Sequence, residues 1–360
     1  MTTGTPHVPP GRLGDPALTL GTDPRSDPRM VAVFGALGAL DHPAPNPLTA
    51  DAGRETLLGF SVAAEEAFEG LFTVLAQDLK PVDGVSREVR AVTRDGHEIA
   101  LHVHRPDGVD GPLPVIVQIH GGGMVMLSAT GPLYVHWRDE MAKAGAVVVG
   151  VDYRNAGGAA GANPFPTGLD DCAAAIRWVH ANLAELGGTR IVVTGDSGGA
   201  NLSLAVAIKA RREGWVGEIA GVYAQCPYIL GTWDEPPAEL HSLWENDKYW
   251  LDRALFPLLA EVYDPDGENV DDPTCWPSRA EPADLGGLPP HVISVNECDP
   301  LRDEGLAYHR LLVAAGVPSV GKINLGLCHV GELLFQNAMP EVYAEAVRDV
   351  TGFARGVSAS

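Results

Sequence analysis

The stretch RIVVTGDSGGANL, residues 190–202, decides the architecture of this chain of 360 residues. Its first part is a short, mostly apolar run that predicts a strand over residues 190–194. The strongly apolar sequence of residues 200–210 predicts a helix. Between them, GDSGG requires a sharp turn, because a β-carbon on either side of Ser197 would collide with neighbouring backbone. The sequence therefore predicts a strand, a strained turn with a serine at its tip, and a helix.

Further short apolar runs predict the rest of a sheet. They lie at residues 114–119, 146–151, 219–224 and 291–295, and helix-like segments separate most of them. Continuous apolar runs are typical of strands buried on both faces, and alternation of strands with helices specifies a mostly parallel sheet flanked by helices. We therefore predict an α/β fold whose active site lies at the carboxyl ends of the strands.

The N-terminal part of the chain predicts a hairpin, a long helix and an arm. Residues 86–93 and 98–103 alternate in polarity, and Asp95-Gly96 between them suits a tight hairpin. Residues 51–76 carry apolar side chains every three or four positions and predict an amphipathic helix. The first 50 residues, rich in Pro, Gly and Asp, predict a partly extended arm with one short helix near residues 30–40 and no chemistry.

A Trp- and Pro-rich insertion at residues 227–289 breaks this alternation, with helical pieces expected near residue 240 and over residues 251–262. With the early helices it is expected to form a helical cap over the carboxyl edge of the sheet. The expected division is an N-terminal arm with cap helices (1–84), a first core part (85–226), the cap insertion (227–289) and a second core part (290–360). The cap insertion contains four tryptophans, Trp233, Trp244, Trp250 and Trp276. They offer apolar surface either for a closed pocket of limited depth or for packing of the cap itself.

The predicted strand, turn and helix form the context of a nucleophile elbow, in which a tight turn exposes a serine hydroxyl. The sequence GDSGG, residues 195–199, also surrounds the nucleophile of chymotrypsin-like proteases. Those proteases are all-β and place His and Asp before Ser, so the α/β pattern around Ser197 excludes them.

The general base is predicted by elimination, because in α/β-hydrolases the acid and then the His follow the nucleophile. Four histidines come late enough in the chain. Three of them fall in the insertion, in a buried strand and in a helix expected over residues 301–315: His241, His291 and His309. The remaining one, His329, lies in the loop GLCHVG after the strand-like run 319–325, and it is the predicted base.

The residue that orients His329 should follow the strand at residues 291–295. Asp299 lies there, in the sequence NECDP. Asp303 and Glu304 fit better in the first turn of the next helix, where the helix dipole stabilises a carboxylate. Glu297 is the main competitor of Asp299.

Donors for the oxyanion are expected in the sequence HGGG, residues 120–123, at the end of the strand 114–119. The backbone N–H groups of Gly121 and Gly122, together with that of Gly198 after the nucleophile, can converge on one oxygen. These three glycines are the predicted oxyanion hole.

With these motifs in place, the sequence resembles the hormone-sensitive-lipase family of α/β-hydrolases, also called bacterial esterase family IV. The resemblance rests on HGGG at 120–123, VDYR at 151–154, PFP at 164–166, GDSGGANL at 195–202, DPLRDEG at 299–305 and His329. It implies the α/β-hydrolase fold, with Ser197, Asp299 and His329 as catalytic triad. Departures from the family pattern, such as Gly198 for Ala and NAGGAAG at 155–161 for Leu-Ala-Pro-Glu, leave the shape of the pocket open.

The predicted activity is that of a serine carboxylesterase that forms an acyl-enzyme on neutral, short-chain esters. An amidase or transacylase would use the same triad. Plant hormone receptors resemble the same family but lack its catalytic His, which this sequence retains at His329. The formal charge of −22 disfavours nucleic acid, anionic membranes and anionic substrates.

Five scattered cysteines without metal-ligand spacing are expected to be reduced, and neither a metal nor a cofactor is predicted. Cys298 and Cys328, which precede Asp299 and His329, could form a redox-sensitive pair or simply fill the core. The N-terminal sequence lacks a signal peptide pattern and no stretch is apolar enough to span a membrane, so a soluble, cytoplasmic protein is expected. An edge strand at 319–325 allows a homodimer.

Overall fold

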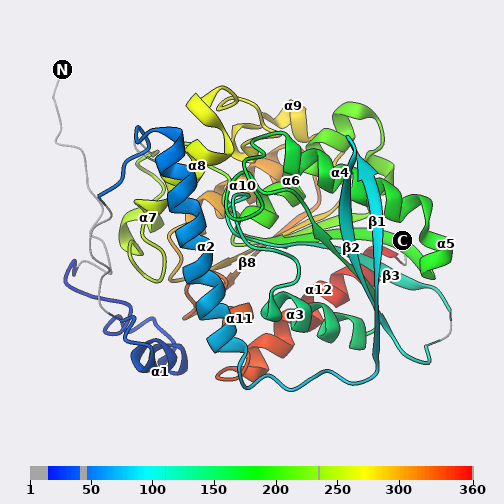
Figure 1. Cartoon of the computed structure of the whole chain (residues 1–360), viewed down its shortest axis with the longest axis horizontal. Helices are drawn as coiled ribbons and strands as arrows, with labels where there is room; N and C mark the ends of the chain where they lie inside the picture. The colour runs from blue at the N-terminus through cyan, green and yellow to red at the C-terminus, as the bar shows by residue number, and fades with distance from the viewer. Residues whose placement is uncertain (1–14, 41–46, 110, 234–235, 359–360) are drawn as a thin grey trace.

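An eight-stranded sheet forms the centre of the computed structural model, which describes residues 15–40, 47–109, 111–233 and 236–358. The strands follow the order β1-β2-β4-β3-β5-β6-β7-β8 (Figure 1). Their bounds are β1 (Val85–Arg94), β2 (His97–Pro106), β3 (Leu113–Ile119), β4 (Val147–Asp152), β5 (Gly188–Asp196), β6 (Gly221–Gln225), β7 (His291–Asn296) and β8 (Ser319–Asn324). β2 is antiparallel to β1 and β4, and the pairs from β4 through β8 are parallel. The predicted mostly parallel sheet is confirmed.

Helices cover both faces of this sheet. One face packs against α4 (Thr167–Ala181), α6 (Gly198–Glu213) and α10 (Arg302–Ala314), and the other against α3 (Pro132–Lys143) and α12 (Pro340–Ser358) (Figure 1). Short helices α5 (Leu183–Leu186), α9 (Pro282–Leu285) and α11 (Gly331–Leu334) lie in the connections. Because helices cover both faces, the central strands are buried on both sides, as their apolar runs predict.

The register of the parallel strands brings their carboxyl ends to one edge of the sheet. Ile119 of β3 pairs with Gly195 of β5, and Asp196 of β5 pairs with Gln225 of β6. Gln225 in turn pairs with Ser294 of β7. The segments that follow these strands therefore begin side by side, as expected for a site on a parallel sheet.

The predicted hairpin is present, because Asp95 and Gly96 both adopt positive φ, 53° and 76°, as a type I′ turn requires. The helix α1 (Pro28–Ala36) starts where the Asp27 carboxylate caps the N–H of Arg29. It ends earlier than residue 40, because Gly38 adopts a left-handed conformation.

Two other predicted helices begin later than their apolar patterns suggest. The long helix α2 (Arg54–Ala76) begins three residues later than expected, and α7 (Ser242–Glu245) and α8 (Leu255–Tyr263) correspond to the helical pieces predicted in the insertion. α8 begins at residue 255 instead of 251, because the carboxylates of Asp247 and Asp252 bind the N–H groups of Arg253 and Ala254 in a turn. In the described part of the chain, no helix has the length and the apolar composition needed to cross a membrane.

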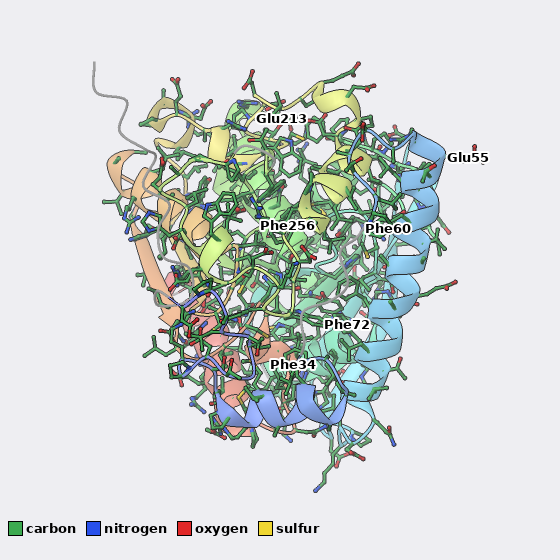
Figure 2. The ribbon with its side chains drawn as sticks, turned by 90° about the vertical axis from the view of Figure 1, so that its left-hand side faces the viewer. Phe34, Glu55, Phe60, Phe72, Glu213 and Phe256 are labelled. Carbon is green, nitrogen blue, oxygen red and sulfur yellow. The ribbon has the colours of Figure 1, made fainter. Side chains whose placement is uncertain are left out.

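The N-terminal arm packs against the loop that carries His329. α1 lies across one end of the molecule, beside the C-terminal end of α2 (Figure 2). The N–H of Asp27 donates to the carbonyl of Gly326 at 2.9 Å, and the N–H of Cys328 points at the sulfur of Met30 at 3.4 Å. The arm, for which the sequence predicts no chemistry, thus supports the backbone of the loop that carries His329.

Two polar side chains of α2 fasten this helix to the core. Glu65 is buried, and its two carboxylate oxygens accept the N–H groups of Leu127 at 2.7 Å and Ala159 at 2.5 Å. The hydroxyl of Ser61 accepts the N–H of Gly158 at 2.9 Å. Glu65 therefore satisfies two backbone donors from two different loops at the carboxyl edge of the sheet.

We predict that Glu65→Ala lowers the free energy of unfolding by about 3 kcal/mol, because two buried N–H groups lose their acceptor. Denaturation in urea, followed by circular dichroism, measures the change. The matched control is Glu66→Ala, which removes an exposed carboxylate of the same helix and is expected to change stability by less than about 0.5 kcal/mol. Equal losses in both variants would contradict the role of Glu65.

Candidate active site

Ser197 occupies the strained turn between β5 and α6. Its backbone has φ 53° and ψ −117°, a conformation that residues other than glycine rarely adopt. Its N–H donates to the carbonyl of Gln225 at 2.9 Å, which holds the turn to β6. A β-carbon at Gly199 would lie 2.2 Å from the carbonyl oxygen of Ile119, so only glycine fits there. The turn leaves the side chain of Ser197 partly exposed at the carboxyl edge.

Asp299 and His329 form a buried pair beside this turn. Nδ1 of His329 lies 2.8 Å from one carboxylate oxygen of Asp299, and the other oxygen accepts the N–H of Leu301 at 2.9 Å. Burial by itself lowers the pKa of His329, but the charge and hydrogen bond of Asp299 outweigh it, so the pKa lies above its ordinary value. The pair therefore favours the imidazolium form of His329.

The competing carboxylate, Glu297, points elsewhere. It accepts the N–H of Gly326 at 2.9 Å and thus holds the start of the loop that carries His329. Asp303 and Glu304 lie in the first turn of α10, as predicted. Glu304, however, is buried and accepts the N–H of Ile229 at 2.7 Å, and burial raises its pKa to about 8. Its main contacts are with the insertion, which local sequence does not reveal.

The three other late histidines lie apart from this pair. Nδ1 of His291 contacts the carbonyl of Pro289 at 2.6 Å at the start of β7, and Nδ1 of His309 contacts the hydroxyl of Ser319 at 2.8 Å. His241 precedes α7 in the insertion. Each therefore occupies the element that its sequence position predicts.

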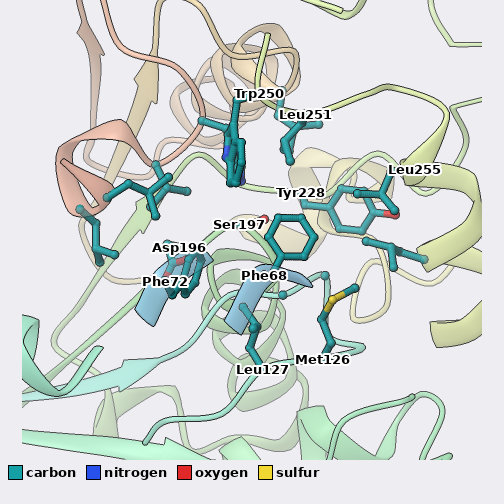
Figure 3. Close-up of a pocket in the computed structure, with 18 of the residues that line it drawn as sticks. Phe68, Phe72, Met126, Leu127, Asp196, Ser197, Tyr228, Trp250, Leu251 and Leu255 are labelled. Carbon is teal, nitrogen blue, oxygen red and sulfur yellow. The ribbon is translucent and has the colours of Figure 1, made fainter. Parts of the chain in front are cut away.

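Ser197 and His329 line one pocket, which has a cavity volume of about 70 Å³ (Figure 3). Phe68 and Phe72 of α2 form one wall, and Trp250, Leu251 and Leu255 of the insertion form another. Two segments far apart in the sequence thus enclose the serine with apolar and aromatic side chains.

The tryptophans of the insertion divide between the pocket and the packing of the insertion. Trp250 lines the pocket and contacts the ring of Phe68 at 5.7 Å between centroids. Trp233 and Trp276 are buried against Tyr228, which Trp233 stacks on at 4.2 Å. Trp244 lies under the guanidinium of Arg253 at 3.7 Å. Of the four tryptophans of the insertion, Trp250 is therefore the one that lines the pocket.

The glycine-rich loop after β3 differs from the predicted arrangement. The N–H of Gly121 donates to the hydroxyl of Tyr134 at 2.9 Å, and Gly121 does not line the pocket. Gly122 and Gly123 do line it, and among the described residues neither of their N–H groups has an acceptor. A β-carbon at Gly198 would lie 2.7 Å from the nitrogen of Gly123, which places the two backbones in contact. The N–H of Gly121 is thus already bound by Tyr134, whereas Gly123, which the sequence did not single out, lines the pocket beside Gly122.

Tyr134 of α3 links the glycine-rich loop to the serine turn. Its hydroxyl accepts from Gly121 and donates to Oδ2 of Asp196, the residue before Ser197, at 2.9 Å. Burial raises the pKa of Asp196 to about 7, against the opposing effect of the Tyr134 hydrogen bond. One phenol therefore sets the distance between the two backbone segments that face the pocket.

The cysteines at the site are buried thiols. Burial raises the pKa of Cys298 to about 12 and that of Cys328 well above its ordinary range, so neither is a reactive thiolate at neutral pH. All five cysteines of the chain are free and buried. This environment fits the interpretation that they fill the core.

One group of side chains at the site has the residue types of a metal site. The ligand atoms of Cys226, Asp299 and His329 lie within 4.8 Å of one another, the one such group in the described ranges. The carboxylate of Asp299 already accepts from the ring of His329 and from the N–H of Leu301. The geometry at these residues is therefore that of a hydrogen-bonded His–Asp pair with a buried thiol beside it.

Fold and site together define a class of protein. A family profile described as alpha/beta hydrolase fold matches residues 116–331, a range that includes the glycine-rich loop, Ser197, Asp299 and His329. The chain belongs to this family of α/β-hydrolases.

Similar proteins narrow the class. Carboxylesterase NlhH of Mycobacterium tuberculosis is 42% identical over 241 residues, which are 64% of this chain and 70% of the relative. The solved structure of brefeldin A esterase, described as a bacterial homologue of human hormone-sensitive lipase, superimposes with a TM-score of 0.94 at 42% identity and covers 98% of this chain and 99% of its own. Esterase Est22 gives a TM-score of 0.84 at 34% identity, over 94% and 99% of the two chains. The resemblance to the hormone-sensitive-lipase family is thereby confirmed.

We predict that Tyr134→Phe lowers kcat by about tenfold or more while KM changes little, because the glycine-rich loop loses its fixed distance from Ser197. Steady-state hydrolysis of a p-nitrophenyl ester measures both constants. Tyr343→Phe is the matched control, since it removes a hydroxyl that contacts His136 outside the pocket. An effect confined to KM would assign Tyr134 to substrate binding instead.

Proposed function

We propose that the protein is a serine carboxylesterase that hydrolyses neutral, short-chain carboxylic esters through an acyl-enzyme. The observation that carries the proposal is a serine in a strained elbow that shares one apolar pocket with a His–Asp pair. The names of its relatives, carboxylesterase and esterase, support the reaction class. The serine nucleophile is Ser197, with His329 as general base and Asp299 as the residue that orients the base.

In the acylation step, the hydroxyl oxygen of Ser197 attacks the ester carbonyl while Nε2 of His329 takes the hydroxyl proton. Asp299 accepts the Nδ1–H and stabilises the imidazolium that forms. The oxyanion receives the N–H groups of Gly122, Gly123 and Gly198, a donor set supported by the free N–H groups of the loop. When the C–O bond of the ester breaks, His329 returns the proton to the leaving alkoxide.

Deacylation repeats these steps with water as nucleophile. His329 takes a proton from water, the hydroxide adds to the acyl carbon, and the bond to Ser197 breaks with return of the proton to its oxygen. The raised pKa of His329 in this environment supports its role as base, because the imidazolium of each intermediate is stabilised.

The substrate preference follows from the pocket and the charge of the protein. The walls around Ser197 are apolar and of limited extent, which favours small neutral esters over emulsified triglycerides. The formal charge of −22 disfavours anionic esters. We assign α1, α2, α7 and α8 to a cap, since α2 and the insertion supply the pocket walls.

The alternatives are distinguished by the substrate. An amidase would cleave a p-nitroanilide at a rate comparable to the matched ester, a transacylase would transfer the acyl group to an added alcohol, and a receptor would bind without turnover. The pairing of His329 with Asp299 favours catalysis over binding alone.

We predict that Ser197→Ala abolishes both turnover of p-nitrophenyl acetate and labelling by an organophosphate, because the hydroxyl is the attacking atom. Mass spectrometry detects the label, and an unchanged melting curve shows that the variant folds. Stoichiometric labelling of this variant would disprove Ser197 as nucleophile.

Asp299→Asn should lower kcat by about three to four orders of magnitude, because an amide no longer orients and stabilises the imidazolium. Glu297→Gln is the matched control and should retain most activity, since its oxygen accepts a backbone N–H of Gly326. A larger loss in Glu297→Gln would reverse the assignment.

A homodimer through β8 and a cytoplasmic location complete the proposal. β8 is an edge strand, and Val320, Ile323 and Leu325 are 59%, 46% and 74% exposed. The five free, buried cysteines are consistent with a reducing compartment. Sedimentation should give a dimer for the wild type and a monomer for Val320→Glu, and a monomeric wild type would exclude this interface.

A further inference from the structure

An apolar surface groove lies behind the pocket, between α1, α2 and the segment after His329. Six of its lining residues are Val33, Ala36, Leu37, Val74, Leu75 and Leu334. We call it the outer groove. Leu37 and Val74 are 38% and 49% exposed, so the groove is open to solvent. Figure 2 shows its two helices meeting at one end of the molecule, with Phe34 and Phe72 pointing inward.

Leu334 is the one described residue that lines both the pocket and the outer groove. It is only 3% exposed, because it fills the space between the two. Its neighbour Phe335 packs edge-on against Phe34 at 5.1 Å between centroids, and Phe34 also contacts Trp250 at 5.5 Å. These ring contacts pack α1 against the insertion and against the segment after His329, and Leu334 lies between the pocket and the outer groove.

The chemistry of the site places the leaving alcohol on this side of the pocket. His329 must return its proton to the leaving alkoxide, so the alkoxide oxygen lies within hydrogen-bond reach of His329. α11, which carries Leu334, begins two residues after His329. Val330, Leu333 and Leu334, which follow His329, line the same pocket and are therefore within reach of an alcohol chain bonded to that oxygen.

We propose that Leu334 is a specificity-determining residue that limits the length of the alcohol chain of the ester, a proposal that rests on the esterase function. A chain that reaches Leu334 must displace its side chain or remain in water, and both cost binding energy in the transition state. A smaller residue would open the pocket into the outer groove, whose apolar walls would then bury the distal methylene groups.

The test compares two ester series below their solubility limits. Alkyl acetates from ethyl to octyl vary the alcohol, and p-nitrophenyl esters from acetate to octanoate vary the acyl chain. Leu334→Ala should raise the ratio of kcat/KM for octyl over ethyl acetate by about tenfold or more. The corresponding ratio in the acyl series should stay near that of the wild type.

Two further variants separate an opened partition from a generally loosened pocket. Leu251→Ala, which widens the pocket away from the outer groove, should leave the octyl-to-ethyl ratio unchanged. Ala36 is an exposed residue of the groove wall, so a tryptophan at this position would occupy the groove. Adding Ala36→Trp to Leu334→Ala should therefore remove the gain in the octyl-to-ethyl ratio. Leu334→Val should give a smaller shift in the same direction, and it provides the test if the Ala variant unfolds.

Three results would overturn the proposal. They are an unchanged ratio in a folded Leu334 variant that still hydrolyses ethyl acetate, an equal gain in Leu251→Ala, and a gain confined to the acyl series. Absence of ester hydrolysis in the wild type would instead refute the esterase function, so the two failures can be told apart.

Discussion

The alignment of the parallel strands at one edge of the sheet is the constraint on which the candidate site depends. β3 leads into the glycine-rich loop, β5 into Ser197 and β7 into Asp299, and the ladder pairs place the ends of these strands side by side. β6 contributes the carbonyl of Gln225 that holds the N–H of Ser197. Because the strand ends are locked by hydrogen bonds and by helices on both faces, the loops that follow can be short and still meet.

Buried carboxylates at the carboxyl edge of the sheet are held in place by hydrogen bonds. Asp299 is fully buried, and its carboxylate is satisfied by His329 and by the N–H of Leu301. A second buried carboxylate, Glu332, accepts from the amide groups of Gln225 and Asn296 at 3.0 and 2.6 Å. It therefore ties the helix after His329 to β6 and β7, the two strands that follow β5 in the sheet. Such satisfied networks hold a site rigidly, because each unpaired member would carry a large desolvation cost.

The substrate side of the site is built from different parts of the chain than the catalytic side. The pocket walls come from α2 and from the insertion, and these are fastened to the core by Glu65 and by Glu304. Neither carboxylate is among the residues that line the pocket. The separation allows these walls, including Phe68 of α2 and Trp250 of the insertion, to define which esters fit without altering the proton transfers at Ser197.

The sequence by itself determined the strands, the elbow and the chain order of Ser197, Asp299 and His329, because apolar runs, flanking glycines and the order of elements are local or linear properties. Only the tertiary structure decided which N–H groups of the HGGG loop are free. That choice depends on Tyr134, which reaches Gly121 from α3 and Asp196 from 62 residues away. The same holds for Leu334, whose position between two cavities arises from the packing of α1 and α2 against the loop of His329. Hydrogen-bond direction and cavity shape are set by neighbours distant in the chain, and a single sequence carries no local signal for them.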